Sequence, residues 1–411
     1  MSYLSREKTI WPQEDRTDIA IKFILFLISP FMSFLYSLRT INRKSSFIVG
    51  FLFCICFGMA FTVGNVREEG SIDGISYRIK FENYLNDSGL DYYSGLEDFL
   101  SFQGSTKDYY FDTIAFYVSR ITDNYHVMFM AFAIIFAFFM YKSLRILTED
   151  DSFQCGLVGI LLVAMFCWNS IFNINGVRFW TAAWVGTYAI LQCFYKGKWQ
   201  YLALALITPF IHGSFWFFLI VALVALLLGR FRKVWVSLFF ISMFVSNVAV
   251  DIFDVTSDYI PSFLEGTIAY YTDDFYMQDV HQRSLIVTLF DIAYKAYLNI
   301  LIVLLIISDK SQINKVDKKF FGFLLVYMTI VNFFGLIPSL GNRFLVVAMP
   351  FIALMWLRVY KMQVRNVWIL LFPACFLLQI YQLIKYQYLA VLDWSFYFSS
   401  PFMMIFDYLV V

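Results

Sequence analysis

FIVGFLFCICFGMAFTVG, residues 47–64, decides the fold class of this chain. The stretch carries no charged residue over its 18 positions. An α-helix rises about 1.5 Å per residue, so this stretch nearly matches the roughly 30 Å thickness of a bilayer's hydrocarbon core. Because lipid offers no water to backbone polar groups, a helix is the conformation in which such a stretch crosses it. The sequence therefore predicts a membrane-spanning helix here.

Similar stretches recur along the whole chain. Of the 411 residues, 60% are hydrophobic and 15% are charged, whereas soluble domains carry about 25% charged residues. We therefore predict a single all-α integral-membrane domain over residues 1–411, a polytopic transmembrane helical bundle. About twelve spans are expected, at roughly 19–38, 47–64, 127–147, 153–170, 178–195, 199–212, 213–229, 235–252, 285–307, 320–337, 344–360 and 366–384.

Charge and cysteine content exclude several classes of function. The formal net charge is +1, so no basic field attracts nucleic acid. The six cysteines lie inside apolar runs, without the histidines or carboxylates that a metal site needs. Phosphate-binding glycine loops with their lysine, HExxH and GxSxG are missing. We therefore expect no metal and no other cofactor.

Basic turns set the sidedness of the predicted spans. Lysine and arginine collect on the cytoplasmic side of membrane proteins, and turns such as RTINRKSS (39–46) and GRFRK (229–233) recur at every second connection. Both termini and two long loops, 65–126 and 253–284, are then expected to be extracytoplasmic. These loops combine tyrosine with aspartate, which suits carbohydrate binding and equally an aromatic belt at the membrane interface.

One predicted hairpin is too short to cross the membrane twice. Residues 199–229 are flanked by basic turns, and two full crossings would need about 40 helical residues. The turn FIHGSF (210–215) is therefore expected to stop below the outer surface, in a broken or re-entrant hairpin. Such a break is tolerated where it lines a wet cavity, so we expect His212 and Ser214 in a pit that opens to the outside.

Arginines at the outer boundary are candidates for binding an anion. Arg178 follows Asn175 and Gly176 at the start of a span, where a helix N-terminus adds free N–H groups and partial positive charge. Arg343 follows the turn PSLGN in the same way, and Arg283 lies just before another span. The alternative is that these arginines reach for lipid headgroups.

Four motifs in fixed order resemble the EpsG family of bacterial polysaccharide-polymerisation proteins: GNVREEGSIDGISYRIKF (64–81), NGVRFWTAA (175–183), IHGSF (211–215) and GNRF (341–344). Members commonly show a glycine–aspartate–tyrosine set, an Asn-x-x-Arg-x-x-x-Ala start and a His-x-Ser turn. The matching positions are Gly70, Asp73 and Tyr77; Asn175, Arg178 and Ala182; and His212 and Ser214. The resemblance spans roughly residues 20–360, and the wider spacing of Gly70 and Asp73 departs from the usual pattern.

The resemblance implies a Wzy-like membrane glycosyltransferase of the bacterial cytoplasmic (inner) membrane. It would extend an O-antigen, capsule or exopolysaccharide from polyprenyl-diphosphate-linked repeat units at the outer leaflet, and membrane lipids and a chain-length regulator protein are further expected partners. The predicted catalytic residues are His212, Asp73 and Arg178, with His212 and Asp73 both candidates for the base that activates the acceptor hydroxyl. The predicted substrate-binding residues are Arg343, Arg283, Asn175, Tyr77, Ser214 and Arg67.

Two other functions use the same residues. A flippase or other transporter of lipid-linked oligosaccharide would hold the diphosphate with the same arginines, but its charges should be spread through the depth of the bilayer. Apart from Asp291 and Lys295, the strong charges here cluster at the outer boundary, which favours an enzyme. An O-antigen ligase would share the outer site and differ in its acceptor.

Overall fold

The computed structural model describes residues 11–61, 73–101, 108–245, 285–308, 315–335, 338–362 and 394–410. Regular structure in these ranges is helical throughout, which confirms the all-α class. The α-helices are α1 (Arg16–Ile28), α2 (Pro30–Ser37), α3 (Lys44–Ala60), α4 (Asp73–Asn86), α5 (Leu90–Leu100), α6 (Tyr110–Ser119), α7 (Tyr125–Thr148), α8 (Leu157–Phe166), α9 (Val177–Ile190), α10 (Leu202–Ile211), α11 (Phe215–Leu228), α12 (Arg232–Ser242), α16 (Leu285–Ser308), α17 (Lys315–Phe333), α18 (Pro338–Tyr360) and α20 (Pro401–Ile405). Short 3₁₀ and π segments are η1 (Leu38–Thr40), η2 (Ile171–Gly176), η3 (Leu191–Tyr195), η4 (Trp199–Tyr201), η6 (Trp394–Tyr397) and η7 (Phe406–Val410).

The described helices include four stretches that are long and apolar enough to cross a membrane. These are Tyr125–Thr148, Leu157–Tyr195, Asp291–Ser308 and Gly341–Tyr360. The chain is therefore a helical membrane protein, and the figure of about twelve spans stays a prediction. The predicted span at 366–384 and the second outer loop, 253–284, lie outside the described residues.

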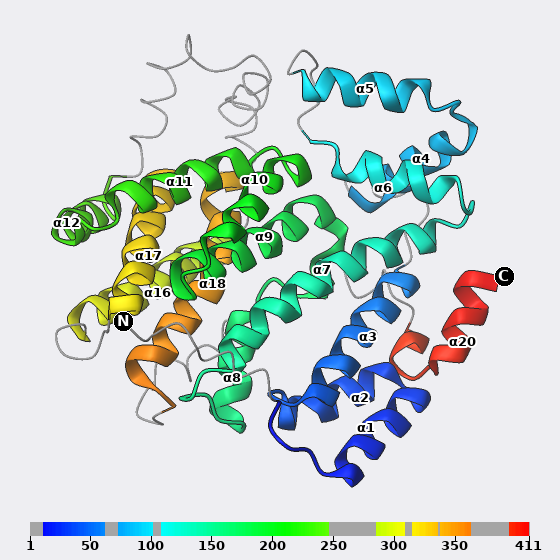
Figure 1. Ribbon diagram of the computed structural model, residues 1–411, viewed down its shortest axis with the longest axis horizontal. Coiled ribbons are helices and arrows are strands. Elements are labelled where there is room, and N and C mark those ends of the chain that lie inside the picture. The colour runs from blue at the N-terminus through cyan, green and yellow to red at the C-terminus, as the bar shows by residue number, and fades with distance from the viewer. Residues whose placement is uncertain are drawn as a thin grey trace.

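Tight helix packing builds the centre of the bundle. α7 lies between α3 and α9, and α10 packs on α9 (Figure 1). A side chain at Gly58 of α3 would place its Cβ 2.3 Å from the Ala133 Cβ of α7. Small residues of this kind let membrane helices approach closely, because packing rather than hydrophobic burial drives their association in lipid.

The hairpin after residue 199 is broken where the sequence predicted. α10 has 10 residues and α11 has 14, so they extend only about 15 and 21 Å. His212 lies between them in an extended backbone conformation, and Pro209 lies in the last turn of α10. Each helix is therefore shorter than the hydrocarbon core, and the path of this hairpin through the membrane stays a prediction.

The predicted span at 19–38 is wrong, because the chain turns back in its middle. Ser29 is extended, and Pro30 begins α2. Proline lacks the N–H that would continue the hydrogen-bond ladder of α1. α2 then packs against α1, and the Ser33 hydroxyl donates a hydrogen bond to the Lys22 carbonyl. The segment therefore forms a helical hairpin.

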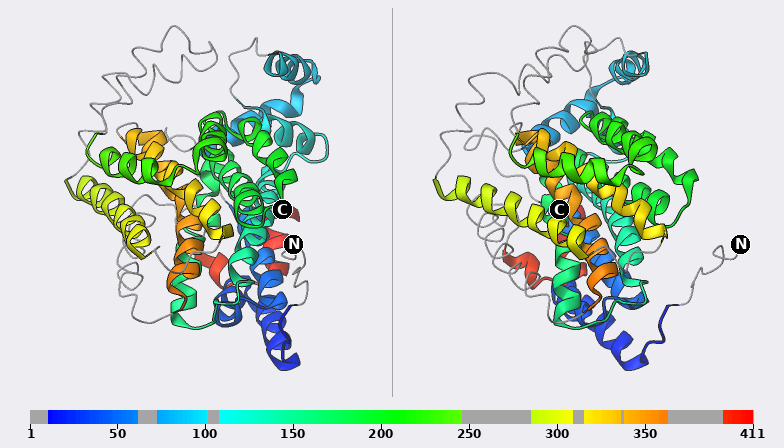
Figure 2. Two further views of the ribbon diagram at one scale, coloured as in Figure 1. Left: turned by 60° about the vertical axis from the view of Figure 1, so that its left-hand side comes forward. Right: turned by 90° about the vertical axis from the view of Figure 1, so that its left-hand side faces the viewer.

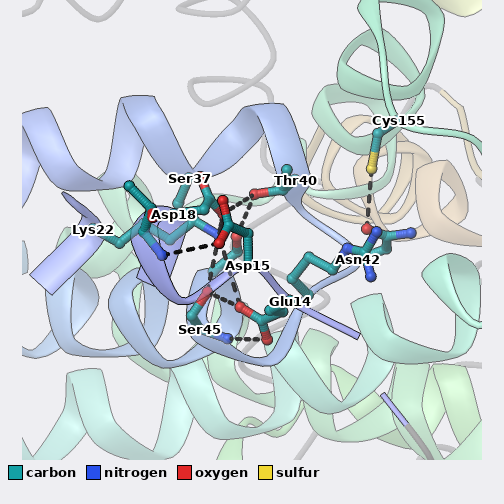
Figure 3. Close-up of polar contacts among 12 residues, drawn as sticks. Glu14, Asp15, Asp18, Lys22, Ser37, Thr40, Asn42, Ser45 and Cys155 are labelled. Atoms are coloured by element: carbon teal, nitrogen blue, oxygen red, sulfur yellow. Dashed lines mark hydrogen bonds and ion pairs between the residues drawn. The ribbon is translucent and has the colours of Figure 1, made fainter. Parts of the chain in front are cut away.

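This hairpin brings residues 14–22 to the turn RTINRKSS (Figure 3). Lys22 is fully buried; its Nζ lies 2.6 Å from Asp18 Oδ2 and donates to Ser45 Oγ at 2.9 Å. The Ser45 N–H donates to Glu14 Oε1 at 3.1 Å. Figures 1 and 2 show α1 and α2 at the end of the molecule opposite α4–α6. Residues 14–22 therefore lie beside the RTINRKSS turn, which contradicts the expectation that the N-terminal segment and this turn are on opposite sides of the membrane.

Cysteine labelling tests this corrected topology. In a cysteine-free background, Ser94→Cys on the exposed face of α5 should react with an impermeant maleimide in intact spheroplasts. Thr17→Cys, exposed at the start of α1, should react only after permeabilisation, because positive-inside sidedness puts it in the cytoplasm with the basic turns. Labelling of Thr17→Cys in intact spheroplasts would contradict the corrected arrangement.

The predicted outer loop 65–126 contains a helical layer. α4, α5 and α6 lie together above the bundle, in cyan at the top of Figure 1. Aromatic rings hold the layer together: Tyr92 and Phe116 stack with centroids 4.1 Å apart, and the buried Tyr109 packs beside Tyr92. The Tyr109 N–H donates to the Phe210 carbonyl at 3.0 Å, so this layer contacts the broken hairpin directly.

Candidate functional site

Arg178 lies where the outer helical layer meets the bundle. It is the second residue of α9, which confirms the predicted position in the first turn of a helix. Its Nε donates to the Tyr77 hydroxyl at 3.2 Å, and one terminal nitrogen donates to Asp108 Oδ1 at 3.0 Å. A guanidinium has five N–H groups, and the described residues accept from two of them. With 35% of its side chain exposed, Arg178 can bind a further anion.

Asp108 holds this arginine from below the surface. Its side chain is only 4% exposed, and its Oδ2 accepts a long hydrogen bond from the Gly213 N–H at 3.4 Å. Burial raises the pKa of Asp108, and the neighbouring Arg178 acts in the opposite direction. Asp108 also connects the arginine with the turn of the broken hairpin.

Tyr77 fixes the other side of the guanidinium. Tyr77 is buried on α4 and stacks on Phe111 of α6 with centroids 4.7 Å apart. The Arg178 Cζ lies 5.6 Å from the centroid of the Tyr77 ring. The predicted substrate-binding residue therefore contacts the predicted catalytic arginine, and in this structure it orients that arginine.

Asn175 anchors the start of α4 beside Arg178. The Gly74 N–H donates to Asn175 Oδ1 at 2.8 Å, and both groups are buried. A Cβ at Gly74 would lie 2.8 Å from that oxygen, so a larger residue there would force the Asn175 amide to shift. Asp73 is the first residue of α4, so its backbone immediately precedes the Gly74 N–H that bonds to Asn175. The Asp73 side chain is not among the described groups.

His212 and Ser214 form a local turn at the tip of the broken hairpin. Ser214 Oγ lies 2.8 Å from His212 Nδ1, and the Ser214 N–H donates to the same nitrogen at 3.2 Å. Because Gly213 between them bonds to Asp108, the turn is connected to the arginine. The structure thus brings together two predicted elements that are 34 residues apart in the chain, Arg178 and the His-x-Ser turn.

Arg343 reaches the same neighbourhood through Phe179. The Phe179 ring packs edge-on against His212 with centroids 5.3 Å apart, and the Arg343 Cζ lies 5.5 Å from the Phe179 centroid. Arg343 is exposed. It does not begin its helix, because α18 starts at Pro338, a residue preferred in the first turn. The predicted outer turn PSLGN is therefore helical.

Two predicted substrate-binding residues, Arg67 and Arg283, lie outside the described residues. In the part of the chain that the structure describes, no group of three histidine, cysteine or carboxylate side chains is arranged to hold a metal ion. The described site is thus an arginine with a buried aspartate, a tyrosine, a histidine–serine turn and a second arginine nearby.

Asp108 carries no motif that marks it in the sequence. It stands in KDYYF (107–111), one of two aspartate–tyrosine pairs in the outer loop 65–126. Its importance comes from its burial and from its two partners, Arg178 and Gly213, which lie 70 and 105 residues further along the chain. The one available signal was that this aspartate directly precedes an apolar helical stretch, where a buried carboxylate requires a partner.

Comparison with known proteins identifies the family of this chain. The sequence profile of the EpsG family matches residues 49–400, a range that contains every described residue of the site. No curated protein and no solved structure matched the chain. The matched range covers well over half of the 411 residues. The chain therefore belongs to the EpsG family, whose function is of the polysaccharide-polymerase type.

Proposed function

We propose that this protein is a membrane glycosyltransferase that polymerises a surface polysaccharide at the outer leaflet of the bacterial cytoplasmic membrane. A hydroxyl of a lipid-linked repeat unit attacks the anomeric carbon of the growing glycan, which is carried on polyprenyl diphosphate. The new carbon–oxygen bond forms as the bond to the diphosphate breaks. The diphosphate leaves with the bonding electron pair, and the acceptor's proton passes to a base on the protein.

The geometry of Arg178 carries this proposal. Tyr77 and Asp108 hold the guanidinium from two sides, and the remaining N–H groups can meet the oxygens of a diphosphate. An arginine fork matches phosphate oxygens bidentately, which a lysine point charge does not. Such a preorganised donor is most effective where negative charge grows in the transition state. Arg343 adds a second cation beyond Phe179.

The position of the site supports an extracytoplasmic reaction. The site lies beneath the α4–α6 layer, at the end of the molecule opposite the RTINRKSS turn (Figures 1 and 2). Positive-inside sidedness assigns that turn to the cytoplasm. A substrate with a prenyl tail in the outer leaflet would then present its diphosphate at the level of Arg178.

Reconstitution tests the proposed activity. Purified protein in liposomes, given a synthetic polyprenyl-diphosphate repeat unit, should yield a ladder of products that differ by one repeat. Because arginines carry the diphosphate charge in this mechanism, the ladder should persist in EDTA. Loss of the ladder in EDTA would contradict metal independence. Transfer of one unit without further extension, or movement of the lipid across the bilayer without transfer, would contradict polymerisation.

A further inference from the structure

The contacts of His212 determine which of its ring nitrogens carries a proton. Nδ1 lies 3.2 Å from the backbone N of Ser214, whose N–H is the donor. A backbone N–H can only donate, so Nδ1 must present its lone pair. A neutral imidazole with an accepting Nδ1 carries its proton on Nε2. The Ser214 hydroxyl, 2.8 Å from the same nitrogen, can donate to it as well.

The surrounding backbone keeps the ring in this state. Protonation of Nδ1 would place its N–H against the Ser214 N–H, so an imidazolium or the other tautomer would lose this hydrogen bond. The turn is also fixed from outside, because the Gly213 N–H donates to Asp108 Oδ2 and the His212 ring packs edge-on against Phe179. These contacts therefore favour a neutral His212 ring whose proton lies on Nε2.

The His212 turn is connected to both arginines of the site, to Arg178 through Asp108 and to Arg343 through Phe179. Asp108 bonds to Gly213 on one side and to Arg178 on the other. Phe179 packs against His212 in a T-shaped arrangement, and the Arg343 Cζ lies 5.5 Å from the Phe179 centroid. A neutral N–H in such a setting interacts favourably with an anion that the arginines attract.

We infer that His212 is a hydrogen-bond donor to the leaving diphosphate and not the base of the reaction. This inference rests on the proposed function. As the anomeric carbon–oxygen bond breaks, the diphosphate oxygen gains negative charge, and the Nε2–H donates to it while keeping its proton. The proton of the acceptor hydroxyl then passes to Asp73, the other candidate base, which immediately precedes the Gly74 N–H bonded to Asn175.

Two substitutions separate a donor from a base. Glutamine can place an amide N–H near the position of Nε2, whereas asparagine can only replace Nδ1, accepting the Ser214 N–H as in an Asx-turn. His212→Gln should therefore retain at least about a tenth of the wild-type rate, whereas His212→Asn should fall to the level of His212→Ala, at least about tenfold lower than His212→Gln. If His212→Gln is as inactive as His212→Ala, or if His212→Asn equals His212→Gln, the donor role is wrong.

Nitrogen NMR tests the tautomer without any activity. The chain has three histidines, so the signals of His212 are those that disappear from ¹⁵N-histidine-labelled protein when His212→Asn is introduced. The expected pattern is a protonated Nε2 and an unprotonated Nδ1 at neutral pH. A protonated Nδ1 would overturn the inference even if the polymerase assay succeeds. If wild-type protein makes no polymer, the proposed function fails, and the NMR result still decides the tautomer.

Discussion

Arg178→Ala should lower the rate of chain extension about 10²–10³-fold, with wild-type amounts of protein in the membrane. This is the cost of removing one preorganised donor from a developing anion in a desolvated site. Charge on the diphosphate increases as the bond to the sugar breaks, so turnover should fall more than donor binding. Single-turnover extension of a labelled lipid-linked repeat unit, with donor binding measured separately, gives both quantities.

Arg178→Lys distinguishes positive charge from fork geometry. A lysine keeps the charge, but its single ammonium cannot reproduce the planar contacts to both Tyr77 and Asp108 while binding two phosphate oxygens. We expect Arg178→Lys to remain well below wild type and above Arg178→Ala. Equal rates for Arg178→Lys and wild type would show that charge alone suffices.

Arg78 offers a matched control. It follows Tyr77 on α4, its side chain is 36% exposed compared with 35% for Arg178, and it pairs with Glu82 at 2.8 Å. Arg78→Ala should leave the rate within about twofold of wild type, as is usual for an exposed ion pair. If Arg178→Ala behaved like Arg78→Ala, Arg178 would be an anchor for lipid headgroups and the anion site would be wrong.

The sequence predicted those features of the fold that depend on local signals. Apolar length indicated the long helices, and the shortness of residues 199–229 indicated the break at His212. It did not predict the N-terminal hairpin, because segment 19–38 is apolar enough for a span. Ser29–Pro30 was a breaker signal within that segment, and buried polar contacts of Lys22 complete the hairpin. Such contacts depend on the fold and have no periodicity in the sequence.

The same distinction between local signals and contacts that depend on the fold applies to the candidate site. Motifs indicated Arg178, Tyr77 and the His-x-Ser turn, and the structure brings them together. Asp108 could not be found in this way, because its significance lies in being buried between two elements that follow it at a distance. Asn175 shows the converse: its motif position was predicted to bind substrate, but in the structure its amide oxygen is engaged by the backbone of α4.

Asp108→Ala should lower the rate of chain extension about 10²-fold. Removal of the carboxylate leaves Tyr77 as the partner of the Arg178 guanidinium among the described residues, and it removes one hydrogen bond from the turn at Gly213. A displacement of about 1 Å at a reacting centre can cost this much. Asp108→Asn keeps one carbonyl oxygen that can accept the Arg178 N–H. The rate of chain extension should therefore fall less, about tenfold, because a charge-assisted hydrogen bond is weakened but not removed.

The effect on donor binding separates positioning from simple misfolding. Without the negative charge of Asp108, the site is more positive, so the diphosphate donor should bind at least as tightly as in wild type while turnover falls. Asp112→Asn is the matched control. Asp112 lies on α6 and accepts a hydrogen bond from the Tyr84 hydroxyl at 2.7 Å. The rate of chain extension by this variant should stay within about twofold of the wild-type rate. If Asp108→Ala weakened donor binding in proportion to turnover, Asp108 would contribute to the shape of the site, and its proposed orientation of the arginine would be wrong.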